Sequence, residues 1–553
     1  MNYLIDRIRY KNYLEANIII KDISGIIDFF SSDDEKDEFL TSNESLAPEA
    51  CEGRASYGDW QTPEPLAEKV CEKHIERFGQ PNIVIEPTCG LGAFVMAALK
   101  KFPEVAEIHA LEINYRYTIE LKHRLLLNAL LCPTQRHPDI YIYNADFFEF
   151  DFTPVIERSK TCGMNIAIVG NPPWVTNSHQ GKHNSGNLPA KNNTYKLRGI
   201  EAITGRSNFD ISEYITLELL KLSQDRKGGM SFLLKNSVVR NILQKQRNEN
   251  LHIGKFEQQL IDAAAEFNVS VDASCLSVNF DSVPSYSCRI TDFYSGTFLR
   301  EYGWIGDCFV SDTLLYKKFS KYDNVSTYVW RSGIKHDCSS VLELTMSAGA
   351  YFNGLGERVE IESDMIFPLL KSSDINHYKE NKFRKFLVIT NRKVGEDTSV
   401  LRKTHPLTYK YLISHETDFL NRKSSIYKGK DKFSIFGVGD YSFKPFKIVV
   451  SSLYKTINFK IISQYEGKPV MVDDTCYQLD FDNLEEAERI YEILTGNEIQ
   501  SLLQSLIFKD AKRVVTKSLL MRLDLTRLCR EKGIAIPSQR FVDSQYRQLS
   551  LFN

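Results

Sequence analysis

Features that define several large protein classes are missing from this sequence of 553 residues. No run of about 18 apolar residues occurs, so we predict no membrane-spanning helix. The N-terminal segment is charged throughout and has no apolar block of the kind that signal peptides carry, which predicts a cytoplasmic protein. The 11 cysteines form no CxxC pair, so we expect reduced thiols in a protein core and neither a disulfide framework nor a metal site.

Composition is that of a globular protein, but the charge is unevenly spread. Hydrophobic residues make up 42% of the chain and charged residues 25%, which excludes fibrous and wholly disordered proteins. The formal net charge is only −2. Residues 21–60 carry 3 basic and 11 acidic residues, whereas residues 381–470 carry 18 basic and 7 acidic residues. This asymmetry predicts a separate, positively charged module in the C-terminal half.

The pattern of apolar residues divides the chain into three predicted parts. Residues 1–56 are expected to form a helical lead followed by an acidic, serine-rich stretch, residues 31–45, which we interpret as a loose surface segment. Residues 57–295 alternate short apolar strands with helices, which predicts an α/β domain with a mostly parallel, doubly wound sheet. Residues 296–553 combine aromatic-rich strands, glycine turns and a helical final stretch, which predicts a mixed α+β domain.

The first regular element of the α/β part is predicted to begin next to Thr62. The segment from Thr62 to Phe78 has the period of an amphipathic helix. A threonine followed by proline is typical of an N-cap and the first helical position, so we expect Thr62 to cap this helix and Pro63 to open it.

Candidate ligand-binding residues lie where three successive predicted strands end. Residues 86–92, EPTCGLG, join a strand to a helix; their glycines allow a close ligand, and the helix N-terminus favours a carboxylate or phosphate. Glu112 ends the next strand, where doubly wound folds place an acid that binds ribose hydroxyls. Asp146, after the third strand, can accept from an exocyclic amine while Phe147 stacks on the ring. Together these residues predict a cofactor that contains adenosine.

Two alternatives stay open for these strand ends. Each position taken singly is also compatible with an ordinary turn that carries a solvated acid. A nicotinamide cofactor is the second alternative, but the pattern GxGxxG is incomplete, because Gly92 is followed by Ala93, Phe94 and Val95. Three such strand ends in succession favour the adenosine cofactor.

A second motif, Asn171-Pro172-Pro173-Trp174, directly follows the predicted strand IAIVG. Two consecutive prolines fix the backbone and remove two N–H donors. The groups that remain are acceptors, namely the Asn171 side-chain oxygen and the Pro172 carbonyl, which suit an amino group with two N–H bonds. Trp174 offers a flat surface for the ring that carries this amine. The motif predicts a pocket for a planar, amine-bearing base or amide; its structural alternative is a strand end with Trp174 in the core.

These motifs, in this order, resemble the gamma class of S-adenosylmethionine-dependent DNA adenine-N6 methyltransferases, the TaqI-like modification enzymes. The class carries cofactor motifs, then (N/D)PP(Y/F/W), then a C-terminal target-recognition domain. The resemblance implies a Rossmann-like methyltransferase domain over residues 57–295 and a DNA target-recognition domain over residues 296–553. It also implies S-adenosylmethionine as cofactor and double-stranded DNA as partner. The corresponding expectation is a monomeric bacterial or archaeal enzyme, with a separate restriction endonuclease that acts on the same site.

The resemblance also assigns roles to individual residues. The implied cofactor-binding residues are Thr62, Glu86, Pro87, Thr88, Cys89, Gly90, Gly92, Glu112, Asp146, Phe147 and Pro173. The implied catalytic residues are Asn171 and Pro172, which grip the target amine, and Trp174, which stacks on a flipped adenine in place of the commoner tyrosine. Phe267 resembles the aromatic residue that covers the other face of the base, and core packing is its alternative role. No metal is implied.

Two further segments are expected to meet DNA. Residues 175–208 are polar and asparagine-rich, which predicts a functional loop that orders on DNA. The basic residues of 381–470 are expected to contact phosphates, while a few side chains read base edges. A solvated β-rich face is the alternative for this basic stretch.

Other functions remain open at the level of sequence. The same amine pocket serves methyltransferases that act on RNA bases, on a protein glutamine, or on the N4 amine of cytosine, where serine often replaces the first asparagine of the motif. A single-chain restriction enzyme would need a PD…(D/E)xK nuclease domain, and neither residues 1–56 nor the C-terminus offers one. A non-catalytic DNA-binding module on a methyltransferase scaffold is the alternative that involves no enzyme.

Overall fold

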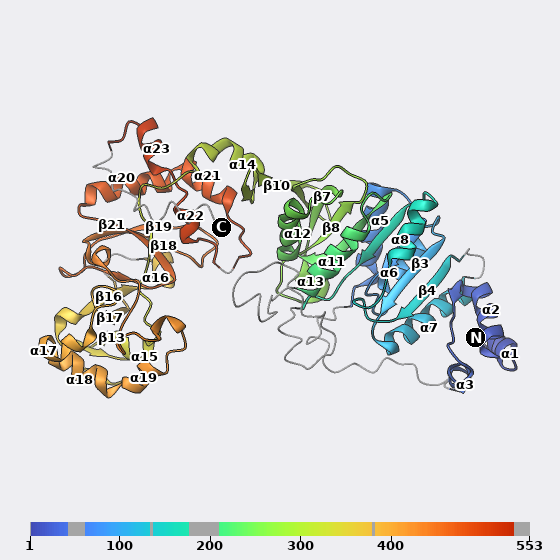
Figure 1. Cartoon of the computed structure of the whole chain (residues 1–553), viewed down its shortest axis with the longest axis horizontal. Coiled ribbons are helices and arrows are strands. Elements are labelled where there is room, and N and C mark those ends of the chain that lie inside the picture. The colour runs from blue at the N-terminus through green and yellow to red at the C-terminus, as the bar shows by residue number, and fades with distance from the viewer. Residues whose placement is uncertain are drawn as a thin grey trace. The chain divides into compact units, whose positions relative to one another are not determined.

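The computed structural model describes two compact units, residues 1–309 and residues 310–553 (Figure 1). The described residues are 2–41, 61–132, 137–175, 210–378, 382–511 and 513–535. Within these ranges, no helix has the length and apolar character needed to cross a membrane. The same ranges contain no cluster of three or more His, Cys, Asp or Glu side chains that could hold a metal ion.

The first unit is built around one large sheet. Its strands are β1 (Ile26–Ile27), β2 (Ile83–Glu86), β3 (Glu107–Glu112), β4 (Asp139–Asn144), β5 (Ile166–Gly170), β6 (Gly228–Lys235), β7 (Gly254–Ile261), β8 (Ala273–Asn279), β9 (Ser287–Asp292), β10 (Phe298–Ile305) and β11 (Cys308–Val310). They lie in the order β1-β4-β3-β2-β5-β6-β8-β7-β9-β10-β11. All pairs from β1 to β6 are parallel, while β8 is antiparallel to both of its neighbours. The mostly parallel sheet predicted from the sequence is confirmed.

Helices cover both faces of this sheet. They are α1 (Asn2–Ile8), α2 (Tyr13–Ser24), α3 (Asp33–Thr41), α5 (Glu64–Phe78), α6 (Ala93–Lys101), α7 (Tyr115–Leu131), α8 (Thr153–Thr161), α11 (Ile211–Leu222), α12 (Asn236–Glu249) and α13 (Ala263–Phe267). On one face, α5, α6 and α7 share a core with Val84, Ile108 and Ala167 of the strands. Side chains alternate along a strand, so the neighbours Ile83 and Ile166 point to the opposite face, and they are fully buried too. The sheet is therefore doubly wound, as predicted.

Residues 2–41 belong to this unit. Strand β1 pairs with β4 and lengthens the sheet at one edge. The acidic stretch 31–45, which we predicted to be loose, forms helix α3 over most of its described part, so that prediction is wrong there. The physical reason is an aromatic contact, because Phe39 packs against Phe29 and Phe30 at the edge of the core. Acidic residues in the first turn of α3 also suit a helix N-terminus.

The first unit also continues beyond residue 295. Strand β9 pairs with β7, β10 pairs with β9, and the sheet extends to β11. The structural division therefore falls after Phe309 and differs from the predicted boundaries at residues 56 and 295. The periodicity of a strand does not say which other strand it pairs with, so the sheet to which β10 and β11 belong could not be assigned from sequence.

The second unit has mixed α+β structure, as predicted. Its strands are β12 (Arg331–Ser332), β13 (Glu343–Ser347), β14 (Ala350–Phe352), β15 (Arg358–Val359), β16 (Ile366–Leu370), β17 (Lys385–Val388), β18 (Phe446–Ser451), β19 (Phe459–Ile462), β20 (Met471–Val472) and β21 (Cys476–Phe481). Its helices are α14 (Thr313–Phe319), α15 (Ser339–Leu342), α16 (Ser372–Asn376), α17 (Leu401–Thr404), α18 (Pro406–Ser414), α19 (Glu416–Leu420), α20 (Leu484–Thr495), α21 (Asn497–Leu506), α22 (Lys517–Leu520) and α23 (Leu525–Glu531). The strands form two sheets, in the orders β12-β21-β18-β19 and β15-β14-β13-β17-β16-β20.

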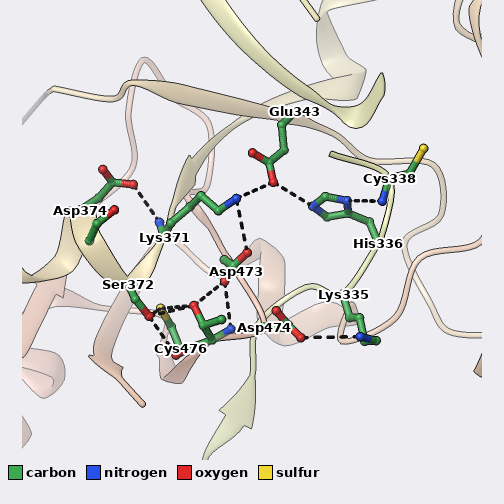
Figure 2. A network of polar contacts seen from close by, with 12 residues as sticks. Lys335, His336, Cys338, Glu343, Lys371, Ser372, Asp374, Asp473, Asp474 and Cys476 are labelled. Carbon is green, nitrogen blue, oxygen red and sulfur yellow. Dashed lines mark hydrogen bonds and ion pairs between the residues drawn. The ribbon is translucent and has the colours of Figure 1, made fainter. Parts of the chain in front are cut away.

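A buried polar network ties separate segments of the second unit together (Figure 2). Lys371 Nζ donates to Glu343 Oε1 at 2.6 Å, and His336 Nε2 lies 3.4 Å from the same oxygen. Burial alone would raise the pKa of Glu343, but the hydrogen bonds from His336 and Lys371 outweigh it and lower this pKa to about 2. Lys371 Nζ also lies 4.0 Å from Asp473 Oδ2. The network fixes β13, the start of α16 and the turn before β21 to one another.

Candidate active site

The parallel strands bring the predicted site residues to one edge of the first sheet. Strands β4, β3, β2, β5 and β6 are neighbours in that order and run in the same direction. Their carboxyl ends therefore form a row, which is where α/β sheets bind ligands. Asp146 follows β4, Glu112 ends β3, Glu86 ends β2 and Asn171 directly follows β5.

The loop between β2 and α6 depends on its two glycines. Gly90 (φ +52°) and Gly92 (φ +79°) have left-handed backbone conformations that other residues rarely adopt. A side chain at Gly92 would place its Cβ 2.1 Å from Leu121 Cδ1. A Cβ at Gly90 would meet Gln61 Oε1 at 2.9 Å. Both positions therefore favour glycine for their backbone conformation, and Gly92 also for its close approach to Leu121.

Buried polar atoms beneath this loop lack hydrogen-bond partners among the described residues. Glu86 is buried, and its Oε2, like the hydroxyl of Thr88, has no partner there. Burial raises the pKa of Glu86 well above its usual value; a hydrogen bond from the Val95 backbone opposes this rise, and the nearby Glu112 adds to it. An unpaired buried acceptor is costly. Both atoms therefore fit a ligand that supplies N–H or O–H donors.

Glu112 connects the loop to the next strand. Its Oε2 accepts from Gly90 N–H at 2.8 Å, and its Oε1 accepts from Asn114 N–H at 2.7 Å. A carboxylate oxygen can accept more than one hydrogen bond. These bonds hold Glu112 in place without excluding a hydroxyl donor from a ligand.

Asp146 and Phe147 lie at the other end of the row. Asp146 Oδ1 accepts from Phe148 N–H at 3.0 Å. The Phe147 ring contacts the rings of Phe148 and Phe152, with centroid distances of 6.0 and 6.2 Å. An acid and an aromatic ring are thus neighbours after β4, and their predicted contact with an adenine stays a prediction.

Cys89 is enclosed by the same loop. Burial raises the pKa of its thiol well above the usual value, and the charges of Glu86 and Glu112 add to this effect. The thiol therefore stays protonated and is unsuited to act as a nucleophile. This agrees with a packing role.

The motif after β5 contacts the segment that precedes α5. Asn171 Nδ2 donates to Thr62 Oγ1 at 3.3 Å. Pro63 and not Thr62 is the N-cap of α5, and no side chain among the described residues caps this helix. The prediction that Thr62 caps α5 is therefore wrong, because its hydroxyl is used across the site. The neighbouring Gln61 Oε1 accepts from Leu91 N–H at 3.1 Å, so this segment links the glycine loop to the second motif.

The two predicted base-stacking residues are in contact with each other. The rings of Trp174 and Phe267 have centroids 5.3 Å apart and an angle of 68° between their planes, an edge-to-face arrangement. Both side chains are buried. Trp174 Nε1 donates to the carbonyl of Leu233 at 3.2 Å. Phe267, which ends α13, is thereby brought to the second motif from a distant part of the sequence.

Comparison with known proteins decides the family. The chain is 39% identical over 475 residues to the type II methyltransferase M.NspV of Nostoc sp. (strain ATCC 29411 / PCC 7524), and the match covers 85% of this chain and 97% of that protein. This chain belongs to the type II methyltransferases of restriction–modification systems. No protein-family model matches the chain.

Solved structures of restriction–modification enzymes also share similarity with this methyltransferase. The type IIL restriction-modification enzyme MmeI in complex with DNA matches 83% of this chain and 64% of its own, with 11% identity and a TM-score of 0.49. The type IIG restriction endonuclease BpuSI matches 92% of this chain and 61% of its own, with 14% identity and a TM-score of 0.36. The methyltransferase thus spans less than two thirds of either chain.

Two residues beside the second motif of the methyltransferase, Lys235 and Asp210, were not predicted from the sequence. Lys235 Nζ donates to the Trp174 carbonyl at 2.9 Å and to Asp210 Oδ2 at 2.6 Å. The available signal was a lysine that ends the otherwise apolar strand GGMSFLLK. Of the loop predicted over residues 175–208, only Val175 lies within the described residues.

The basic stretch of the methyltransferase has mixed roles within the second unit. Arg422 donates to the carbonyls of Phe419 and Ser434, so it serves the interior of this unit. Lys447 is fully buried, and burial lowers its pKa to about 7. Arg402 and Lys403 of α17 are exposed. The excess positive charge therefore overstates the number of cations available to a partner.

Proposed function

We propose that this methyltransferase transfers a methyl group from S-adenosylmethionine to the N6 amine of a flipped adenine in double-stranded DNA. The observation that carries the proposal is the contact between Phe267 and Trp174. Trp174 belongs to the motif that also contains Asn171 and Pro172. Aromatic rings next to a pair of acceptors suit a planar ring with an exocyclic amine. Membership of the family indicates that the reaction is methyl transfer. The residues of the site favour the amine of a base as the group that accepts the methyl.

Residues at the ends of β2, β3 and β4 would hold the cofactor. The orphaned acceptors of Glu86 and Thr88 support this assignment, because S-adenosylmethionine carries an ammonium group that donates hydrogen bonds. Glu112 would accept from the ribose hydroxyls, and Asp146 with Phe147 would bind the adenine ring. When bound, the cofactor supplies an electrophilic methyl group.

Asn171 and Pro172 would activate the target amine. An amine attached to an aromatic ring is a poor nucleophile, because its lone pair is delocalised into the ring. Two hydrogen bonds, accepted by the Asn171 side-chain oxygen and the Pro172 carbonyl, pull the nitrogen toward tetrahedral geometry. The lone pair could then attack the methyl carbon of a bound S-adenosylmethionine in line. The new N–C bond would replace the sulfur–methyl bond, S-adenosylhomocysteine would leave, and the methylated amine would release one proton to solvent. Positioning is the main catalytic contribution, and no covalent enzyme intermediate is needed.

The base must leave the duplex to reach these residues. The rings of Trp174 and Phe267 are in direct edge-to-face contact, so a base that stacks between them would need room that this arrangement lacks. We therefore expect both rings to turn and present their faces when the base enters. Asn171 favours adenine over cytosine, because the N4 cytosine enzymes often carry serine at this position.

The second unit would recognise the DNA target. Exposed cations such as Arg402, Lys403 and Lys410 suit phosphate contacts. A monomer is sufficient for this reaction, because each strand can be methylated separately. A separate restriction endonuclease that cleaves the same unmodified site would be the functional partner.

Methyl transfer from labelled S-adenosylmethionine to unmethylated bacterial DNA, followed by nucleoside analysis, tests this proposal. We expect label in N6-methyldeoxyadenosine alone. Label in N4-methyldeoxycytidine would keep the amine mechanism and change the base. Label that appears only in RNA or protein would overturn the proposed substrate.

A further inference from the structure

Lys235, the last residue of β6, binds the main chain of the second motif and the residue before α11 through its side chain. Its Nζ donates to the Trp174 carbonyl at 2.9 Å and forms an ion pair with Asp210 Oδ2 at 2.6 Å. Asp210 is held in turn, because its Oδ1 accepts from the backbone N–H and the hydroxyl of Ser212. Ile211 N–H donates to the Val175 carbonyl at 2.9 Å, directly beside this pair.

The second motif has few backbone donors of its own. Pro172 and Pro173 have no backbone N–H, so two positions of the motif cannot donate to the neighbouring strand. Fewer backbone N–H groups are therefore available to hold the motif, and donors from elsewhere that bind its carbonyl groups become more important. Lys235 supplies one such donor to Trp174, and its side chain is largely enclosed, as is that of Asp210 (18% and 9% exposed).

The ring and the main chain of Trp174 are held by different groups. The indole N–H donates to the Leu233 carbonyl, and the ring contacts Phe267. Both contacts involve the side chain, and we expect them to change when a base enters between the two rings. The bond from Lys235 involves only the carbonyl of Trp174, so it can persist while the side chain turns.

We propose that Lys235, oriented by Asp210, is a positioning residue for methyl transfer. It fixes the backbone of Trp174 while the indole ring reorients. The acceptors of Asn171 and Pro172 therefore stay in position to bind the entering amine. The role of Lys235 in catalysis rests on the proposed function. The conformational part of the inference, that Lys235 fixes the Trp174 backbone in the free protein, does not depend on the proposed function.

The structure offers a matched control pair. Lys245 Nζ, on α12, binds Glu213 Oε1 at 2.5 Å, with side chains 22% and 6% exposed. Glu213 lies in the first turn of α11, three residues after Asp210, so both pairs attach the start of the same helix. Glu213, the partner of Lys245, belongs to α11 and not to the second motif. The loss of stability that comes from removing a partly buried lysine should therefore be similar in Lys235→Met and Lys245→Met.

The catalytic part is tested by steady-state kinetics on DNA that carries the site found by sequencing the modified product. We expect Lys235→Met to lower kcat by about 10- to 100-fold, because small misplacements near reacting atoms have effects of this size. KM for S-adenosylmethionine should hardly change. Asp210→Asn keeps the cap of α11 but removes the charge, and should show a smaller loss. Lys235→Arg should restore most of kcat, and Lys245→Met should match the wild type.

The conformational part is tested without DNA or catalysis. The protein is labelled with 5-fluorotryptophan, and the Trp174 resonance is assigned by Trp174→Phe. We expect this resonance to shift or broaden in Lys235→Met and in Asp210→Asn, but not in Lys245→Met, with similar thermal unfolding midpoints. An unchanged Trp174 resonance and unchanged kcat in Lys235→Met would overturn the inference. A wild-type protein that methylates no DNA, with the resonance shift still present, would overturn the proposed function alone.

Discussion

Glu86 shows how a single buried carboxyl group can couple proton binding to cofactor binding. Burial raises its pKa well above the usual value, so the folded protein binds this proton more tightly than the unfolded chain does. The contribution of Glu86 to stability is therefore greatest below its unfolded pKa and declines as the pH rises toward the folded pKa. A cationic donor next to its orphaned Oε2 would reverse the preference and ionise it.

We therefore predict that S-adenosylmethionine binding releases a proton from Glu86. Calorimetric titrations in buffers with different ionisation enthalpies measure this release, and the affinity should rise with pH. Glu86→Gln should abolish the release and weaken binding by about 10-fold or more, as expected for a lost charge-assisted hydrogen bond. Glu68→Gln, which changes a carboxylate of α5 that pairs with Lys100, is the control. Equal proton release in wild type and Glu86→Gln would contradict the assignment.

At the scale of secondary-structure elements, apolar periodicity was sufficient to predict the central sheet. Each predicted strand from β2 to β5 and the predicted helices α5 and α6 are present. Buried parallel strands are continuous apolar runs, and the surrounding helices keep a clear period, so both signals are local. Their order along the sheet then places Glu86, Glu112, Asp146 and Asn171 in one row.

Contacts between distant segments could not be predicted in this way. Strand β1 is two residues long, and its assignment depends on β4 being available as a partner. Thr62 precedes a proline, as helix caps often do, but its hydroxyl accepts a hydrogen bond from Asn171 and does not cap the helix. Lys235 was missed for the same reason, since its partners Trp174 and Asp210 lie far from it in sequence. Phe267 was found only through the family resemblance.

The loop between β2 and α6 allows a steric test. Gly92→Ala adds a Cβ that would lie 2.1 Å from Leu121 Cδ1, whereas Gly163→Ala, also at positive φ (+65°), meets no atom within 4 Å among the described residues. Both changes carry the backbone cost of a left-handed conformation, about 1 kcal/mol. We expect only Gly92→Ala to lose cofactor affinity strongly, and to lower the free energy of unfolding by about 1–3 kcal/mol more than Gly163→Ala. Calorimetric binding and chemical denaturation measure the two effects; equal effects of the two variants would contradict this account.

The network around Glu343 allows a test at the level of elements in the second unit. Its depressed pKa, about 2 against 4.5, means that Glu343 contributes stability above the unfolded value, and that this contribution is lost as the pH falls through 4.5 toward 2. Glu343→Gln should lower the free energy of unfolding at neutral pH by about 3 kcal/mol, because it removes the negative charge that Lys371 and His336 both contact.

Chemical denaturation as a function of pH measures this loss, which should shrink in acid. Glu357→Gln is the matched control, since Glu357 pairs with His415 through a side chain that is 53% exposed. Its effect should be small, because exposed ion pairs contribute little to stability. A pH-independent loss in Glu343→Gln would contradict the role given to its ionised form.

At the scale of the whole molecule, the second unit is proposed to supply DNA affinity. Its basic stretch includes cations that serve the fold, such as Arg422 and Lys447, alongside exposed ones such as Arg402 and Lys403. Only exposed cations can release counterions from DNA phosphates. The salt dependence of binding therefore separates the two groups better than affinity at a single salt concentration.

We predict that the double change Arg402→Gln and Lys403→Gln weakens DNA binding and reduces the slope of log K against log salt by up to about 1.8, or about 0.9 for each phosphate contact. The double change Lys317→Gln and Lys318→Gln removes the same charge from exposed positions of α14 outside the basic stretch and is the control. Fluorescence anisotropy over a range of salt concentrations measures both slopes. Equal slopes for the two double variants would place the DNA contact elsewhere.

The central claim is that Asn171 grips the amine of an adenine, and methyl transfer by Asn171→Ala tests it most directly. Wild type and variant are compared with labelled S-adenosylmethionine on unmethylated bacterial DNA, with Asn241→Ala of α12 as the control for the loss of a half-buried asparagine. We predict that labelled N6-methyldeoxyadenosine falls by at least about 100-fold in Asn171→Ala, while cofactor binding and the unfolding midpoint stay near wild type. Methyl transfer by Asn171→Ala at the rate of the wild type would contradict the claim.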